Sequence, residues 1–195
     1  MEKIIFISFP RTNNLLLVRF LKFLFKDDFC SQYHNCGTVP CTCNPQKKLS
    51  KTFDFELDIP ITDDNFYMYI ENEDKIKNIE YYFHFWLFVN NIHEKNYSKY
   101  NDKIQNIIQY YDKLHKKYST KKSNILHVYS QDFEKNPQET LNKVFLFLKP
   151  VISIEKIQET KEYINELSFQ NYVAKKSEND LYDYIKNFMN QQHSE

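Results

Sequence analysis

Glycine is almost absent from this 195-residue chain, because it occurs only once, at Gly37. Dinucleotide-binding fingerprints and Walker A loops each need several glycines, so both motifs are excluded. Net charge is also missing, since 26 lysines and arginines balance 26 aspartates and glutamates. We therefore expect no nucleic-acid binding through overall charge, although this leaves a local basic patch open.

Long apolar runs and targeting segments are absent as well. The most apolar stretch, residues 15–25, is interrupted by Arg19 and Lys22, so it is too short and too charged to span a bilayer. The N-terminus has no signal-peptide pattern, and we expect a cytoplasmic protein without a membrane span. The residues that are present, 42% hydrophobic and 17% aromatic, are typical of a folded globular domain.

Hydrophobic periodicity predicts strands that alternate with helices. The strands are expected at 3–8, 66–70 and 125–129, and the helices at 15–25, 73–91, 98–118, 137–148, 153–167 and 177–190. This alternation indicates one α/β domain over residues 1–195, with a parallel sheet of about four strands. The three predicted strands should lie side by side, and the cysteine-rich segment 30–50 should form an irregular loop inserted after the first helix.

The first predicted strand leads into a polar turn, Arg11-Thr12-Asn13-Asn14, and then into the first predicted helix. A turn of this kind directs backbone N–H groups and the positive end of a helix at one point, which suits a phosphate or sulfate group. Arg11 would add a charge-assisted hydrogen bond to the same anion. The alternative is that Thr12 or Asn13 only caps a buried helix, and the spacing alone favours that cap.

Four segments of the chain resemble motifs of the PAPS-dependent sulfotransferases, where PAPS is 3′-phosphoadenosine 5′-phosphosulfate. The run SFPRTNNLLLVRFL resembles their 5′-phosphosulfate loop, usually S-[FY]-P-[RK]-[ST]-G-x-x-L-[LV]. The cysteine-rich segment followed by KTFDF resembles a small microbial and viral branch that has K-x-H-D-F there. IEYYFHF resembles the helix after the R-x-P-x-x-x-x-x-S-Y motif, and VYSQDFEKNP resembles [VL]-x-Y-E-D-[LF]-x-x-[ND]-P. The shared order implies a three-layer, P-loop-like sulfotransferase fold, an α/β fold with a central parallel sheet flanked by helices.

This resemblance implies transfer of a sulfuryl group from PAPS to a hydroxyl or amine on a small-molecule or carbohydrate acceptor. The transfer is an in-line displacement that needs a cation at the leaving phosphate, oxyanion stabilisation and a base near the acceptor. Arg11 would serve as the catalytic cation. The cofactor would be bound by Arg11 together with Thr12, Asn13, Asn14 and Leu15.

The chain departs from the family pattern at functional positions. Asn13 replaces the loop glycine and Phe53 replaces the histidine base. The arginine that binds the 3′-phosphate falls at Glu73, or at Glu71 when the preceding strand is the anchor, and its serine partner falls at Tyr81. A glutamate at that place would repel the phosphate. The resemblance therefore implies a sulfotransferase with impaired activity; the alternative is a catalytically inactive sulfotransferase-fold binding or interaction protein.

Two further sets of residues have the chemistry of a site. Cys30, His34, Cys36 and Cys41 could hold a structural zinc ion, but their spacing matches no standard zinc finger, and free thiols are favoured over zinc. His84 lies in the apolar run YYFHFWLF, so we expect a buried core histidine, kept as a reserve catalytic base. Three other histidines, His93, His115 and His127, have no partner that the sequence reveals.

Overall fold

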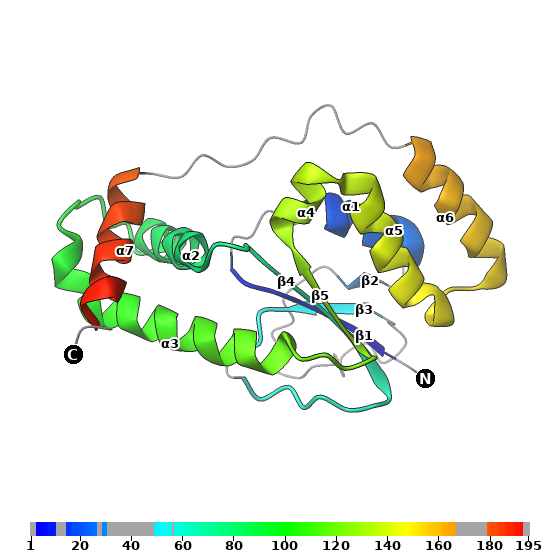
Figure 1. The fold of residues 1–195 in the computed structure, drawn as a ribbon, viewed down its shortest axis with the longest axis horizontal. Helices are drawn as coiled ribbons and strands as arrows, with labels where there is room; N and C mark the ends of the chain where they lie inside the picture. The colour runs from blue at the N-terminus through cyan, green and yellow to red at the C-terminus, as the bar shows by residue number, and fades with distance from the viewer. Residues whose placement is uncertain are drawn as a thin grey trace.

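The structure is a computed structural model, and it describes residues 3–10, 15–26, 29–30, 49–55, 57–166 and 179–192. The fold within these residues is a parallel sheet covered by helices on both faces (Figure 1). The α/β class and the central parallel sheet flanked by helices, which the sequence predicts, are therefore confirmed. No helix of the described residues is long and apolar enough to cross a membrane.

The sheet has the strand order β2-β3-β1-β4-β5, and all neighbouring strands are parallel. Its members are β1 (Lys3–Ser8), β2 (Phe29–Cys30), β3 (Leu49–Thr52), β4 (Asn65–Glu71) and β5 (Ile125–Tyr129). The three predicted strands lie side by side as β1, β4 and β5. With β3 they form the expected sheet of about four strands, and the two-residue β2 extends one edge.

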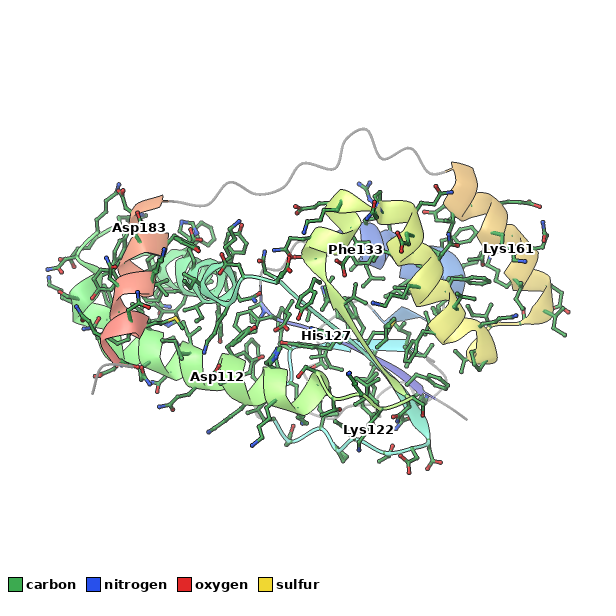
Figure 2. The ribbon with its side chains drawn as sticks, viewed as in Figure 1. Asp112, Lys122, His127, Phe133, Lys161 and Asp183 are labelled. Carbon is green, nitrogen blue, oxygen red and sulfur yellow. The ribbon has the colours of Figure 1, made fainter. Side chains whose placement is uncertain are left out.

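The helices form two layers, one on each face of the sheet (Figure 1). One layer holds α1 (Leu15–Phe25), α4 (Ser130–Lys135), α5 (Pro137–Leu148) and α6 (Ile154–Glu166), and its core cluster also includes Phe6 and Met68. The other layer holds α2 (Lys75–Val89), α3 (Asn101–Tyr118) and α7 (Asn179–Gln192), together with the short 3₁₀ turn η2 (Tyr97–Tyr100). A second 3₁₀ turn, η3 (Lys149–Val151), joins α5 to α6. In Figure 2, Phe133 belongs to the first layer and Asp112 to the second.

Strand β4 is buried on both faces because it lies between β1 and β5 and under both helical layers. Successive side chains of a strand point to opposite faces. Met68 and Ile70 accordingly join the α1 layer, whereas Tyr67 and Tyr69 join the α3 layer. Glu71 shares the face of Tyr67 and Tyr69, so its carboxylate enters the α3 layer, where its side chain has no exposure to solvent.

The predicted elements match the structure closely, with two differences. Helices α1 and α5 and strands β1 and β5 have the predicted bounds, and the other predicted elements shift by a few residues. Strand β3 begins inside the segment that the sequence predicts as irregular. The sequence does not indicate this strand because Leu49–Thr52 contains only one apolar residue. Helix α4 is an additional short helix directly after β5. The rest of the cysteine-rich loop, residues 31–48, lies outside the described residues.

The turn after β3 is held by the side chain of Asp54, which is buried. Oδ1 of Asp54 accepts a hydrogen bond from the backbone of Ile59 (3.2 Å), and Oδ2 accepts from Lys117 Nζ and from Tyr118 Oη, both at 2.7 Å. Asp54 and Leu57 both have positive φ, at 49° and 56°. Because the chain has one glycine, residues other than glycine adopt the left-handed conformation in this turn. The hydrogen bonds to Asp54 offset the strain of that conformation.

We predict that Asp54→Ala lowers the free energy of unfolding by about 3 kcal/mol, because Lys117 and Tyr118 lose their buried acceptor. Urea denaturation followed by circular dichroism measures this difference. Asp58→Ala, at an exposed position of the same segment, is the matched control and should change stability by no more than about 0.5 kcal/mol. Equal stability of the two variants would contradict the structural role of Asp54.

Candidate functional site

The carboxyl ends of parallel strands meet at one edge of the sheet, which is where open α/β sheets bind ligands. The chain leaves β1 at Phe9 beside the end of β4, since the N–H of Phe9 donates to the carbonyl of Ile70 at 3.0 Å. It enters α1 at Leu15. Pro10 and Leu15 therefore bracket the predicted anion-binding turn at this edge. Arg11, Thr12, Asn13 and Asn14 themselves lie outside the described residues.

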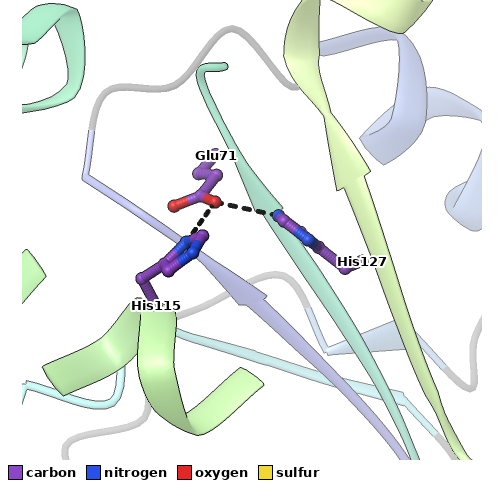
Figure 3. Close-up of side chains that lie close together, drawn as sticks. All are labelled: Glu71, His115 and His127. Atoms are coloured by element: carbon purple, nitrogen blue, oxygen red, sulfur yellow. Dashed lines mark hydrogen bonds and ion pairs between the residues drawn. The ribbon is translucent and has the colours of Figure 1, made fainter. Parts of the chain in front are cut away.

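A buried carboxylate and two histidines meet at the same edge (Figure 3). Glu71 is the last residue of β4, His127 lies in the middle of β5, and His115 lies in the last turn of α3. Oε1 of Glu71 is 2.7 Å from Nδ1 of His115 and 2.9 Å from Nε2 of His127. The side chain of His115 is 39% exposed and that of His127 is 18% exposed, so solvent reaches the histidine side of the cluster.

Tyrosines complete the surroundings of Glu71. The hydroxyl of Tyr69 donates to Oε2 of Glu71 at 2.6 Å. The ring of Tyr69 stacks on His127, with ring centroids 5.2 Å apart and planes inclined by 24°. The ring of Tyr111 stacks on His115 at 5.7 Å and 17°. Each imidazole is thus held in one plane by an aromatic ring while a nitrogen points at the carboxylate.

The environment of Glu71 favours its charged form. Burial alone would raise the pKa of this carboxyl group. Hydrogen bonds from His127 and Tyr69 and the charges of His115 and His127 nevertheless lower the pKa below its ordinary value. Burial and the neighbouring carboxylate raise the pKa of the Tyr69 hydroxyl, which therefore stays a hydrogen-bond donor. The cluster accordingly combines one carboxylate with two nitrogen ligands or bases.

The turn that follows β4 satisfies its own hydrogen bonds. Asn78 accepts from the N–H of Asn72 and donates to the carbonyl of Asn72, at 2.8 and 2.7 Å. Oδ1 of Asp74 accepts from the N–H of Ile76 at 2.9 Å and from that of Lys77 at 3.4 Å, which caps α2. The positive end of α2 is therefore capped by a carboxylate of the chain itself.

The positions that the resemblance assigns to the 3′-phosphate are acidic or engaged. Glu73 is exposed and forms an ion pair with Lys135 at 3.5 Å. Lys75, which a local shift of the alignment would bring there, pairs with Asp112 at 2.5 Å. Tyr81 is half-buried in α2, and burial raises its pKa, as do the nearby carboxylates Glu80, Glu134 and Asp74. None of these described residues forms a cationic pocket for a second phosphate.

The two base positions of the sequence analysis lie in different surroundings. Phe53 follows β3, and its carbonyl accepts a hydrogen bond from Tyr110 Oη at 2.5 Å. His84 is exposed, so the expectation of a buried core histidine is wrong. The reason is that α2 buries only the face of Phe83 and Leu87, and His84 lies beside it. His84 is nine residues after Lys75, the first residue of α2. At 1.5 Å per residue, it lies about 13 Å along the helix axis from the end of α2 that is nearest to β4.

The remaining sequence expectations concern the cysteines. Cys30 is part of β2, but its side chain lies outside the described residues, as do His34, Cys36 and Cys41 entirely. Free thiols and a zinc ion therefore both stay predictions. The histidines that the structure does bring together, His115 and His127, had no visible partner in the sequence. The sequence offered one indication that they meet. His115 lies near the end of a predicted helix and His127 within a predicted strand, and another predicted strand is followed directly by Glu71.

A hollow of about 340 Å³ lies between α2 and α3, and aromatic residues form much of its lining. The lining residues are Phe55, Tyr82, Lys103, Asn106, Ile107 and Tyr110. Phe9, the residue that leaves β1, contacts the rings of Tyr82 and Tyr110 at 5.7 and 5.5 Å. The hollow is therefore close to the end of β1, and its rings and one cation suit a flat or partly apolar organic molecule.

Comparisons with known proteins support the fold. No protein-family model and no curated protein matches the sequence. Among solved structures, the chain is similar to mouse sulfotransferase SULT7A1 in its crystal structure with PAP. The likeness covers 99% of this chain and 81% of that one, with a TM-score of 0.52 and 13% sequence identity. At this identity the likeness shows a sulfotransferase-like fold, as the sequence motifs predict, and the fold alone.

We predict that Asp74→Ala lowers the free energy of unfolding by about 1–2 kcal/mol, because α2 loses its cap. The variant also removes the acceptor of Tyr182 Oη, which contacts Oδ2 of Asp74 at 2.8 Å from α7. Chemical denaturation measures the change, and Asp74→Ser, which can still cap a helix, is the control. Equal loss in the two variants would show that capping is not the role of Asp74.

Proposed function

We propose that this chain binds PAPS at the carboxyl edge of its sheet and transfers the sulfuryl group to a hydroxyl or amine of a small-molecule or carbohydrate acceptor. The observation that carries this proposal is the place of the β1–α1 connection. It leaves the sheet beside Glu71, at the edge where ligands bind, in a fold similar to a sulfotransferase that was crystallised with PAP. The motif SFPRTNNLL supplies the anion-binding chemistry at that connection.

Each step of the transfer has a candidate group in this arrangement. Arg11 would bind the phosphosulfate with the backbone N–H groups of Thr12, Asn13, Asn14 and Leu15 and would stabilise the charge of the leaving phosphate. The aromatic hollow near Phe9 would bind the acceptor. His84 is the base that the sequence offers in place of Phe53. Its exposed position on α2 is remote from the start of the helix, so we expect slow turnover.

A catalytically inactive binding protein is the second candidate, and the acidic turn after β4 favours it. Glu73 is exposed at the position expected for a phosphate-binding arginine, and Asp74 occupies the positive end of α2. Two carboxylates at this place oppose a 3′-phosphate. Under this reading the chain would keep the sulfotransferase fold for binding or interaction without group transfer.

The first test of nucleotide binding is Arg11→Ala. We expect PAP, the desulfonated product, to bind roughly 10- to 150-fold more weakly, which corresponds to about 1.5–3 kcal/mol for a charged hydrogen bond. Isothermal titration calorimetry measures the affinity. Arg19→Ala, on the exposed face of α1, is the matched control and should bind as the unmodified chain does. Equal affinity of both variants would remove Arg11 from the site.

A second test addresses the 3′-phosphate. Glu73→Arg replaces a repelling charge by an attracting one, so the affinity for PAP should rise by about tenfold, or roughly 1.4 kcal/mol, while the affinity for AMP stays nearly constant. Glu155→Arg, at an exposed position of α6, controls for the change of net charge. A similar gain in both variants would show a nonspecific effect and place the 3′-phosphate elsewhere.

A third test separates slow catalysis from none. Phe53→His combined with Glu73→Arg and Tyr81→Ser restores the family pattern, and a positioned base contributes about 10²–10⁴-fold. We expect weak PAP release by the unmodified chain in a broad acceptor mixture and faster release by the triple variant. Strong turnover by the unmodified chain would contradict an impaired site. Binding of PAP without any release in either protein would favour the inactive alternative.

A further inference from the structure

The cluster of Glu71, His115 and His127 is not used by the proposed sulfuryl transfer. It joins three separate elements, β4, α3 and β5, through residues 44 and 56 positions apart in the sequence. Each residue offers one ligand atom, and these atoms lie within 4.8 Å of one another. Figure 3 shows both imidazole nitrogens directed at the same carboxylate oxygen. Among the described residues, this is the group of side chains whose atoms converge as metal ligands do.

We propose that Glu71, His115 and His127 bind a divalent transition-metal ion, with zinc the best match. Two imidazole nitrogens and one carboxylate oxygen are ligands that zinc takes in proteins, and three protein ligands leave a fourth position for water or another oxygen. The ligands are Nδ1 of His115, Nε2 of His127 and an oxygen of Glu71. This proposal does not rest on the sulfotransferase function and is tested without it.

Binding of an ion requires the three ligand atoms, which lie within 4.8 Å of one another, to adjust their separations. A tetrahedral zinc ion with ligands at 2.0–2.1 Å separates its ligand atoms by about 3.3 Å. The two nitrogens are now 2.7 and 2.9 Å from Oε1 of Glu71, so each separation has to lengthen by about half an ångström. Each nitrogen then gives up its hydrogen bond to the carboxylate, with its proton transferred to the other ring nitrogen or to solvent, and binds the ion through its lone pair.

A second layer of residues already orients the ligands. Tyr69 Oη donates to Oε2 of Glu71 at 2.6 Å, which leaves Oε1 directed at the histidines. The rings of Tyr69 and Tyr111 stack on His127 and His115 and fix both imidazole planes. Hydrogen bonds and packing around ligands are typical of metal sites, because they hold the ligands in the geometry that the ion needs.

Burial and access also suit an ion. Glu71 has no exposed side-chain surface, so its charge must be balanced by neighbouring groups. A divalent cation balances it without requiring either histidine to be protonated. His115 is 39% exposed, and solvent therefore provides a path for the ion to the buried carboxylate.

The test is a titration of the full chain with Co²⁺, a spectroscopic substitute for zinc, under reducing conditions. The cysteines could bind metal themselves, and thiolate ligation gives intense near-ultraviolet charge-transfer bands, whereas a nitrogen and oxygen site gives only weak visible bands. We expect one equivalent with visible bands alone. His115→Ala and His127→Ala should each lower the affinity for this Co²⁺ ion by at least about tenfold. Even the loss of a residue that only orients a ligand lowers metal affinity by about this factor.

The controls use other histidines and an independent measurement. His84→Ala and His93→Ala change two exposed histidines near Glu94 at the far end of α2 and should leave the equivalent intact. Co²⁺ should raise the Tm of the unmodified chain and of these controls by more than it raises the Tm of His115→Ala, which we expect to remain folded by circular dichroism because His115 is partly exposed. The proposal is wrong if the unmodified chain lacks the thiolate-free equivalent, or if His115→Ala and His127→Ala retain it. In either case the cluster is only a hydrogen-bonded ion pair.

Discussion

The burial of the Glu71 carboxylate constrains this whole edge of the sheet. A charge without solvent has to be balanced by donors, and here the donors come from two strands and a helix. The requirement fixes how the last turn of α3 approaches β4 and β5. It also places two imidazoles beside the end of β4. The local geometry of the candidate site thus follows from one buried acid and its partners.

The same edge combines features that favour opposite functions. Its fold is similar to that of a sulfotransferase and the motif before α1 resembles theirs, whereas the turn after β4 carries carboxylates at the expected place of a phosphate-binding arginine. Asp74 uses the positive end of α2 for its own cap. The proposed nucleotide binding therefore depends on the β1–α1 connection, whereas the β4–α2 connection satisfies its own hydrogen bonds and caps α2.

The sequence predicted the elements well where periodicity was strong. Helix α1 and strand β5 have their predicted bounds because an apolar run fills each of them. Strand β3 was not predicted because it has one apolar residue. The burial of His84 was overestimated because α2 also carries apolar residues on the face that it exposes to solvent. The Glu71 cluster could not be predicted from spacing, since its members come together only through the tertiary order of β4, α3 and β5.

The order of the strands has a consequence for how the chain assembles. Strand β4 pairs with β1, which lies some sixty residues earlier, and with β5, which follows only after α2 and α3. During synthesis β4 is therefore an open edge strand, and its terminal glutamate lacks His115 and then His127 until each of these residues has emerged. Pairings of such separation are slow to form. Strand β5 thus both covers the open edge of β4 and brings the last donor to the buried acid, so this edge of the sheet is completed late.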